Sequence, residues 1–289
     1  MVQLLESDIE TKEVLTWQGV HLIHFQGSAC SQKTRIFLNL KGIDWEPHPL
    51  NLTTQENFNP WFLGINPRGL VPVLVHDGVV HIESNDILQY LNESFPEPNL
   101  IPTALRDEII ASLQEEDNLH LDLRALTMRF VVPKFLARKK PQSLAALENK
   151  AGTIKGQQDA QKAIELNFWR DYAKQGITNT GAQESARKFH SIYQRFEQHL
   201  ASQLYLCGSE ITLLDIAWFI YTNRLKEAGY PFAQQHPRVA TWYQGLLAKP
   251  EFANEVLSPP PLKLITAALQ LKQRLKKETL SDVAGFEPI

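Results

Sequence analysis

The chain has 289 residues, of which 43% are hydrophobic and 21% charged, so it is long enough for one large or two medium globular domains. Its net charge of −3 gives no basic footprint for nucleic acid, and its two cysteines cannot build the disulfide framework of a small secreted domain. No apolar run has the length that crosses a bilayer, and no residues have metal-ligand spacing, so we expect no membrane and no metal partner.

Residues 1–18 contain "MVQLLESDIETKEV", a segment rich in acidic side chains. A secretory signal needs a basic start and an apolar centre, and a mitochondrial presequence avoids acidic residues. Neither pattern is present. We therefore expect a cytoplasmic protein whose residues 1–18 form a short, partly mobile extension.

Residues 19–96 alternate between strand and helix patterns. Asp77-Gly78 between alternating apolar residues predicts a β-hairpin, and Gly42 is a suitable stop for the first helix. The predicted elements are a strand at 19–25, a helix at 30–42, a strand at 44–52, two strands within 70–84 and a helix at 84–95. This order predicts a small thioredoxin-like α/β domain, which the Pro-rich segment 95–102 ends.

Residues 104–289 predict an all-helical domain. Thr212 and Asp215 form a Thr-x-x-Asp capping box at the start of the most apolar helix, which we interpret as a folding signal. The polar stretch at about 133–182 is interpreted as a helical insertion or a mobile flap. Helices are predicted at 106–131, 185–203, 212–229, 236–252 and, as an extra C-terminal helix, 261–280.

The stretch "GSACSQKTR" brings hydroxyls and a thiol to a predicted strand end and helix start. The positive helix end, with Lys33 or Arg35, would lower the pKa of a nearby thiol. That thiol is either Cys30 itself or the thiol of a bound ligand to which Ser28 donates a hydrogen bond. The alternative is structural: Ser28 caps the helix and Cys30 is a small buried side chain.

Val71-Pro72 stands at the entrance of a predicted buried strand. Proline is disfavoured inside a sheet, and a cis X-Pro bond would solve the geometry, while a trans edge proline is the alternative. A cis bond would also present the backbone N–H and C=O of Val71 to a ligand. An extended peptide pairs with such groups as an added strand does.

Glu83 and Ser84 precede the second predicted helix. With Ser84 as N-cap, the first-turn N–H groups favour an anion, and Glu83 would receive an ammonium group. An anion site beside a carboxylate matches the head group of an α-amino acid. The alternative is a plain cap with a solvated glutamate.

Three stretches, taken in this order, resemble the glutathione S-transferase superfamily. They are "SACSQKTRIFLNLKGIDWE" (28–46), "INPRGLVPVLVHDGVVHIESNDILQYLNESFP" (65–96) and "YLCGSEITLLDIAWF" (205–219). The first is similar to the "S-x-C-S" pattern of zeta-type maleylacetoacetate isomerases and bacterial tetrachlorohydroquinone dehalogenases. "NPWFLGINPRGLVPVL", the insertion and "LCGSEITLLD" also resemble the ganglioside-induced differentiation-associated protein group.

The resemblance implies a role for each candidate residue. Ser28 falls on the serine that stabilises the glutathione thiolate, and Cys30 on the cysteine that forms a mixed disulfide with glutathione in the dehalogenases. The implied contacts to the cysteinyl and γ-glutamyl units of glutathione come from Val71, the cis-proline Pro72, Glu83 and Ser84. No motif fixes the glycine carboxylate, for which Gln55, Asn57 and Arg68 are candidates.

The implied function is a glutathione transferase, with glutathione as cosubstrate and an apolar electrophilic small molecule as second substrate. Two alternatives stay open: a reductive dehalogenase or thiol-disulfide enzyme that uses Cys30, and a non-catalytic binding protein. The resemblance also implies a homodimer. The second substrate is expected beside the helix at 106–131, where we interpret His120 as structural.

Overall fold

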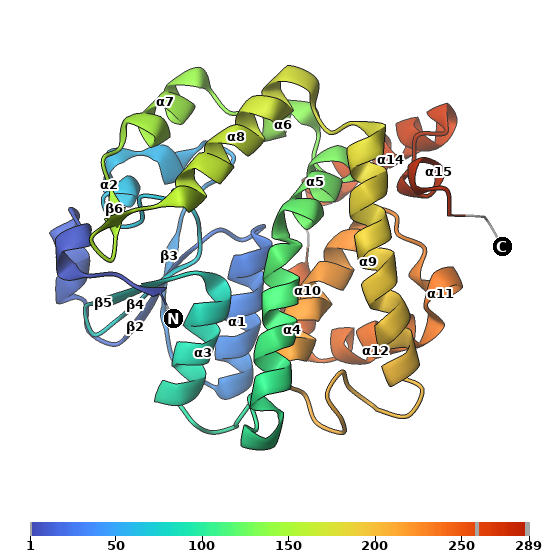
Figure 1. Cartoon of the computed structure of the whole chain (residues 1–289), viewed down its shortest axis with the longest axis horizontal. Coiled ribbons are helices and arrows are strands. Elements are labelled where there is room, and N and C mark those ends of the chain that lie inside the picture. Colours follow the sequence, from blue (N-terminus) through green and yellow to red (C-terminus); the bar gives the residue numbers. More distant parts are fainter. Residues whose placement is uncertain (1, 258–259, 287–289) are drawn as a thin grey trace. The chain divides into compact units, whose positions relative to one another are not determined.

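The computed structural model describes residues 2–257 and 260–286 and consists of two compact units (Figure 1). Unit 1 comprises residues 1–96 and 138–175, and unit 2 comprises residues 97–137 and 176–289. The α/β domain followed by a helical domain is therefore confirmed. The predicted insertion differs from expectation, because most of it belongs to unit 1 and not to the helical unit.

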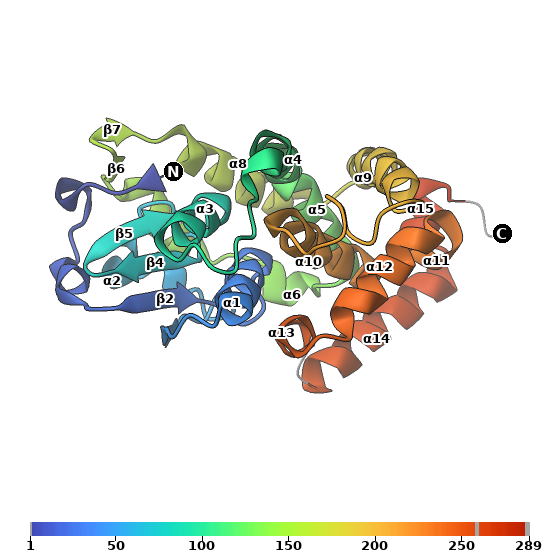
Figure 2. The same cartoon turned by 90° about the horizontal axis from the view of Figure 1, so that it is seen from below.

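A five-stranded mixed sheet forms the centre of unit 1 (Figure 2). Its strand order is β1-β5-β4-β2-β3, with β2 and β3 parallel and the other neighbours antiparallel. The strands are β1 (Val2–Gln3), β2 (Val20–His24), β3 (Glu46–Pro49), β4 (Val73–His76) and β5 (Val79–Ile82). The predicted hairpin is confirmed: Asp77 (φ 49°) and Gly78 (φ 78°) take the left-handed conformations of a two-residue turn.

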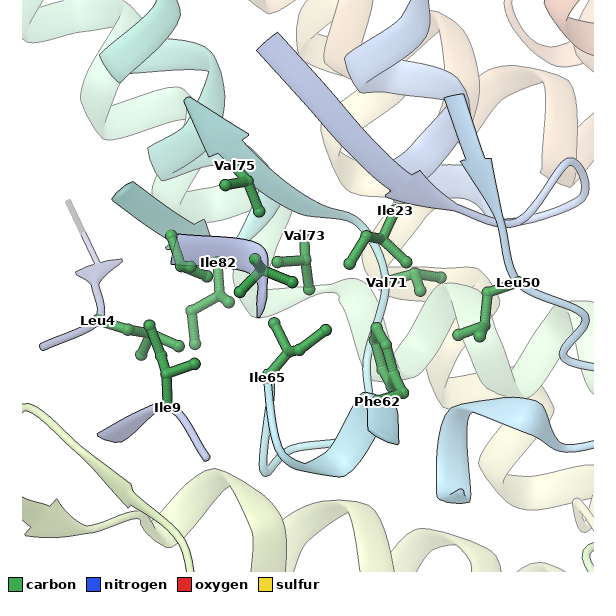
Figure 3. Close-up of a cluster of buried hydrophobic side chains, with 12 residues drawn as sticks. Leu4, Ile9, Ile23, Leu50, Phe62, Ile65, Val71, Val73, Val75 and Ile82 are labelled. Atoms are coloured by element: carbon green, nitrogen blue, oxygen red, sulfur yellow. The ribbon is translucent and has the colours of Figure 1, made fainter. Parts of the chain in front are cut away.

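Two helices cover one face of this sheet and a third segment covers the other. On the first face lie α1 (Ala29–Lys41) and α3 (Ser84–Ser94), side by side in both views (Figures 1 and 2). His81 of β5 stacks on Tyr90 of α3 there, with ring centroids 3.8 Å apart. On the opposite face, Phe62 of α2 (Pro60–Leu63) packs with the strand side chains (Figure 3).

The core on the α2 face includes the N-terminal segment. Leu4, Ile9 and Val14 are at most 3% exposed and belong to the same buried cluster as Ile82. Figure 3 shows Leu4 and Ile9 beside the strand side chains. The prediction of a partly mobile extension at 1–18 is therefore wrong. The acidic side chains concealed three apolar residues that this core buries, and β1 adds an edge strand beside β5.

The segment 138–175 packs onto unit 1. It contains α7 (Pro141–Asn149), a hairpin of β6 (Thr153–Ile154) and β7 (Gln157–Gln158), and α8 (Ala160–Gln175). Leu147 and Leu166 are buried against Phe58 and Leu63. Because both helices bury apolar side chains on the α/β unit, the segment is part of that unit and not a detached flap.

Unit 2 is entirely helical over the residues that the structure describes. The predicted helix at 106–131 is wrong as a single element: it breaks at Leu119 into α4 and α5. The capping box is confirmed, since Thr212 N donates to Asp215 Oδ2 at 2.9 Å. The helices are α4 (Arg106–Asn118), α5 (His120–Phe130), α6 (Lys134–Ala137), α9 (Asn179–His199), α10 (Leu213–Glu227), α11 (Phe232–Gln235), α12 (Pro237–Leu247), α13 (Pro250–Ala253), α14 (Pro260–Lys276) and α15 (Leu280–Ala284).

Candidate functional site

The sheet register brings the predicted site residues to one edge. Ile23 pairs with Val73, and Val73 pairs with Ile82, so these three residues form one row across β2, β4 and β5. Because the strands are antiparallel, β2 leaves the sheet at the edge where β4 enters and β5 leaves. The segments that lead to Ser28, contain Pro72 and contain Glu83 all meet this edge.

Ser28 caps α1 with its hydroxyl group. Its backbone is extended (φ −77°, ψ 125°), and its Oγ accepts a hydrogen bond from the backbone N–H of Ser31 at 3.3 Å. A hydroxyl that accepts through a lone pair keeps its O–H proton for another acceptor. Ser28 is half-buried at the positive end of the helix, so capping and donation to a thiolate are compatible.

Cys30 lies in the first turn of α1 as a half-buried thiol outside any disulfide. Lys33 and Arg35, the charges expected to act on a thiol, are buried instead. Lys33 Nζ donates to Asn85 Oδ1 of α3 at 2.6 Å, which ties the two helices together. These charges therefore serve contacts within unit 1, and the N-terminus of α1 is the electrostatic feature that Ser28 and Cys30 share.

Arg35 holds the turn that precedes Ser28. Its guanidinium donates to the carbonyl oxygens of Phe25 (3.3 Å) and Gln26 (3.1 Å) and contacts His24 Nδ1 at 3.1 Å. Burial, and next the charge of Arg35, lower the pKa of His24 to about 4, so its neutral ring accepts from the guanidinium. This supporting role of Arg35 was not predicted from the sequence, because Arg35 lies nine to ten residues after the carbonyls that it binds.

The Val71–Pro72 peptide bond is cis, as predicted. Two buried asparagines shape the loop before it: Asn57 Nδ2 donates to Gly69 O, and Asn66 Nδ2 donates to Leu70 O, both at 2.8 Å. Asn57, a candidate for the glycine carboxylate, therefore has its amide N–H directed at the loop. The Asn-Pro turn signal in the sequence is the clue that could have identified Asn66.

Glu83 and Ser84 lie at the end of β5 and the start of α3, as predicted. The predicted N-cap residue, however, is wrong. Ser84 is the first helical residue, and Glu83, not Ser84, holds the N-cap position. Glu83 has a left-handed backbone (φ 67°, ψ 116°), a conformation that is strained for a residue with a Cβ and that concentrates at binding sites. Its carboxylate makes no side-chain cap over α3, because it forms an ion pair with Arg68 Nη1.

Arg68 is shared between two carboxylates. Its Nε and Nη2 donate to the two oxygens of Asp159, each at 2.7 Å, and its Nη1 donates to Glu83. Burial alone would lower the pKa of Arg68, but the bonds to Asp159 and the charge of Glu83 raise it, so the guanidinium stays charged. Asp159, from the insertion, was not among the sequence candidates because it lies 91 residues away from Arg68.

The titratable residues near the expected second-substrate helix have structural partners. His120 Nδ1 contacts the hydroxyl of Tyr221 at 3.2 Å, and its Nε2 contacts Arg124 at 3.2 Å, which supports the structural interpretation. Burial, with the charges of Asp215 and Glu108, raises the pKa of Cys207 to about 12, so that thiol is unreactive.

A shallow hollow of about 440 Å³ lies in unit 2 between α4 and α9. Glu115 and Asn118 line it from α4, and Lys188 and Arg195 from α9. The apolar side chains of Leu119 and Ile192 also line it, so the hollow combines apolar surface with charged groups.

Within residues 2–257 and 260–286, no three His, Cys, Asp or Glu side chains are grouped as metal ligands. Among the same residues, every helix is too short or too polar to span a bilayer.

Comparison with protein families finds two matches. The glutathione S-transferase N-terminal domain matches residues 27–94, and the glutathione S-transferase C-terminal domain matches residues 179–245. A zeta-class glutathione S-transferase of Euphorbia esula is 47% identical over 83 residues, 29% of this chain and 37% of the relative. Plant relatives of this kind are matched over 37–42% of their own length.

A longer match involves Protein LigF of Sphingobium sp. strain SYK-6. The two sequences are 27% identical over 239 residues, which cover 79% of this chain and 90% of LigF. The crystal structure of LigF, described as a beta-etherase, superposes with a TM-score of 0.70 over 82% of this chain and 98% of that one. A Drosophila mojavensis homologue with bound glutathione shares the fold, with 17% identity, a TM-score of 0.63 and coverage of 89% and 98%.

Proposed function

Because the chain belongs to the glutathione S-transferase superfamily, we propose that it activates the thiol of glutathione for attack on an electrophilic small molecule. The observation that carries this proposal is the single sheet edge at which Ser28, the cis Val71–Pro72 bond and Glu83 meet. Glutathione would bind along that edge.

Each group at the edge suits one part of glutathione. Val71 would pair through its backbone with the cysteinyl unit. Glu83 would receive the γ-glutamyl ammonium, and the N-terminus of α3 at Ser84 would receive the γ-glutamyl carboxylate. These contacts would place the ligand sulfur towards Ser28.

The thiolate would be stabilised by two features of α1. The Ser28 O–H would donate a hydrogen bond to the sulfur, and the positive helix end would favour its negative charge. The sulfur would then attack carbon, forming a C–S bond as the bond to the leaving group breaks with its electron pair. The thiol proton goes to solvent when the thiolate forms.

The similarity to LigF over most of both chains supports an aryl ether as the electrophile class. In that reaction the carbon–oxygen bond breaks, the aryloxide leaves and it takes a proton from water. The test is incubation of the protein with glutathione and a model β-aryl ether, followed by mass spectrometry. A glutathione thioether and an equal amount of phenol are expected, and neither product above the uncatalysed level would refute this substrate class.

Cys30 supplies a second candidate function, because its half-buried thiol lies two residues from Ser28 in the same helix turn. In a thiol-disulfide mechanism, the Cys30 thiolate would attack a disulfide substrate that contains glutathione. A Cys30–glutathione disulfide would form as the other sulfur leaves as a thiolate, and a second glutathione would then release Cys30 as oxidised glutathione forms. The variant Cys30→Ser distinguishes the two mechanisms: full thioether formation together with full disulfide reduction by this variant supports Ser28, and loss of disulfide reduction supports Cys30.

A further inference from the structure

We infer that Asp159, supplied by the insertion, is a positioning residue that gives the γ-glutamyl subsite its net negative charge. The inference rests on the proposed function and concerns how the same subsite selects its ligand. Its basis is the row of three charged side chains Asp159, Arg68 and Glu83 within unit 1.

The charges of this row decide what it can bind. Arg68 and Glu83 alone would make a neutral pair, in which the guanidinium competes with a ligand ammonium for the carboxylate. Asp159 adds a second negative charge, so the three side chains together carry one net negative charge. A ligand ammonium restores neutrality, as the amino group of an α-amino acid would.

Arg68 donates more hydrogen bonds to Asp159 than to Glu83. Asp159 takes two parallel N–H donors, at 2.7 Å each, whereas Glu83 takes the remaining Nη1. Bidentate pairs of this kind are the strong form of an arginine–carboxylate contact. The guanidinium is therefore held on the Asp159 side, and Glu83 stays at its outer end.

The exposed fractions of the three charged side chains show which of them a ligand can reach. The side chains of Arg68 and Asp159 are 12% and 13% exposed, but that of Glu83 is 33% exposed. Glu83 also adjoins the N-terminus of α3, where the ligand carboxylate would bind. The row thus has a buried inner end, Asp159, and an outer end that a ligand can reach.

The insertion is built to hold Asp159 in place. The hairpin just before it is bound by Asp8, whose carboxylate accepts from Thr153 Oγ1 (2.6 Å) and from the backbone N–H groups of Lys155 (2.8 Å) and Gly156 (3.0 Å). On the other side, α8 begins at the next residue, Ala160, and is packed on unit 1. Asp159 is therefore fixed from both directions along the chain.

The test compares two ligands by calorimetry: glutathione, and glutaryl-cysteinyl-glycine, which is glutathione without its amino group. Wild type is expected to prefer glutathione about tenfold, the size of one partly exposed charge-assisted contact. Asp159→Asn should lose this preference by weakening glutathione alone. Asp159→Ala provides the same measurement with a smaller side chain, should the amide variant fail to fold.

The control is Glu148→Gln, which removes another insertion carboxylate, paired with Arg170 at 2.6 Å. It should keep the wild-type preference. Retained preference in both Asp159 variants, or equal weakening of both ligands, would overturn the role of Asp159 while leaving the proposed function intact. Failure of wild type to bind glutathione would overturn the proposed function and this inference together.

Discussion

Replacing Asp8 with Asn should loosen the β6–β7 hairpin from the N-terminal segment of unit 1. The Asp8 carboxylate is 6% exposed and accepts four hydrogen bonds, from Leu5 N, Thr153 Oγ1, Lys155 N and Gly156 N. An asparagine side chain keeps one acceptor oxygen and replaces the other with a donor NH₂ group. Half of these bonds are therefore lost, and a donor comes to face a backbone N–H.

The expected loss of stability follows from these bonds. Each hydrogen bond to a charged acceptor contributes about 1.5–3 kcal/mol, and neighbouring bonds are not additive, so Asp8→Asn should cost about 2–4 kcal/mol. Burial alone would raise the pKa of Asp8, but its hydrogen bonds, led by that from Thr153, lower it. The contribution is thus complete above the unfolded-state pKa and is lost as the pH falls through the lower folded-state pKa.

Urea unfolding and limited trypsin digestion measure the effect. Asp8→Asn should unfold at lower urea and be cleaved faster after Lys155, which lies in the hairpin turn. The control is Glu10→Gln: Glu10 also pairs with the insertion, through Lys150, but its side chain is 61% exposed, so less than about 1 kcal/mol should be lost. Equal stability and equal cleavage in Asp8→Asn and wild type would show that Asp8 does not hold the hairpin in place.

Three further predictions concern other parts of the chain. Arg35→Met removes the hydrogen-bond donor of the Phe25 and Gln26 carbonyls and should lower the free energy of unfolding in urea by about 2–4 kcal/mol. An unchanged urea midpoint would show that Arg35 does not stabilise the turn before Ser28. Asp215→Asn alters a fully buried carboxylate that accepts a hydrogen bond from Trp242 Nε1 at 3.0 Å. It should lower the free energy of unfolding in guanidinium by about 3 kcal/mol or more, and an unfolding curve equal to that of wild type would contradict this. Sedimentation should give the homodimer that the family resemblance implies, and a monomer at micromolar concentration would contradict that expectation.

Local signals in the sequence predicted the parts of unit 1 that depend on neighbouring residues. Asp77-Gly78 specified the hairpin, and Gly42 ended α1 in the left-handed conformation. Each is a short-range steric or hydrogen-bonding preference. At Val71-Pro72 the local signal left cis and trans open, and the family resemblance implied the cis bond that the structure has. One residue of error remained at α3, where Glu83 and not Ser84 holds the N-cap position.

Long-range contacts could not be predicted in this way. The pairing of Arg68 with Asp159, and of Asp8 with the hairpin, joins residues 91 or more positions apart. Nothing in the local pattern of 133–182 indicates which unit its helices bury their apolar side chains against. The break at Leu119 likewise has no glycine or proline signal, so the sequence predicted one helix where the structure has two.

In the proposed function, the activated thiol belongs to glutathione and Ser28 stabilises its charged form. The direct measurement is the ultraviolet absorbance of the thiolate of bound glutathione as a function of pH, in wild type, Ser28→Ala and Cys30→Ser. Wild type and Cys30→Ser should give a thiol pKa below that of glutathione in solution, and Ser28→Ala should raise it by about one to two units, the loss of a hydrogen bond to the charged form. A pKa unchanged in Ser28→Ala but raised in Cys30→Ser would contradict the role proposed for Ser28.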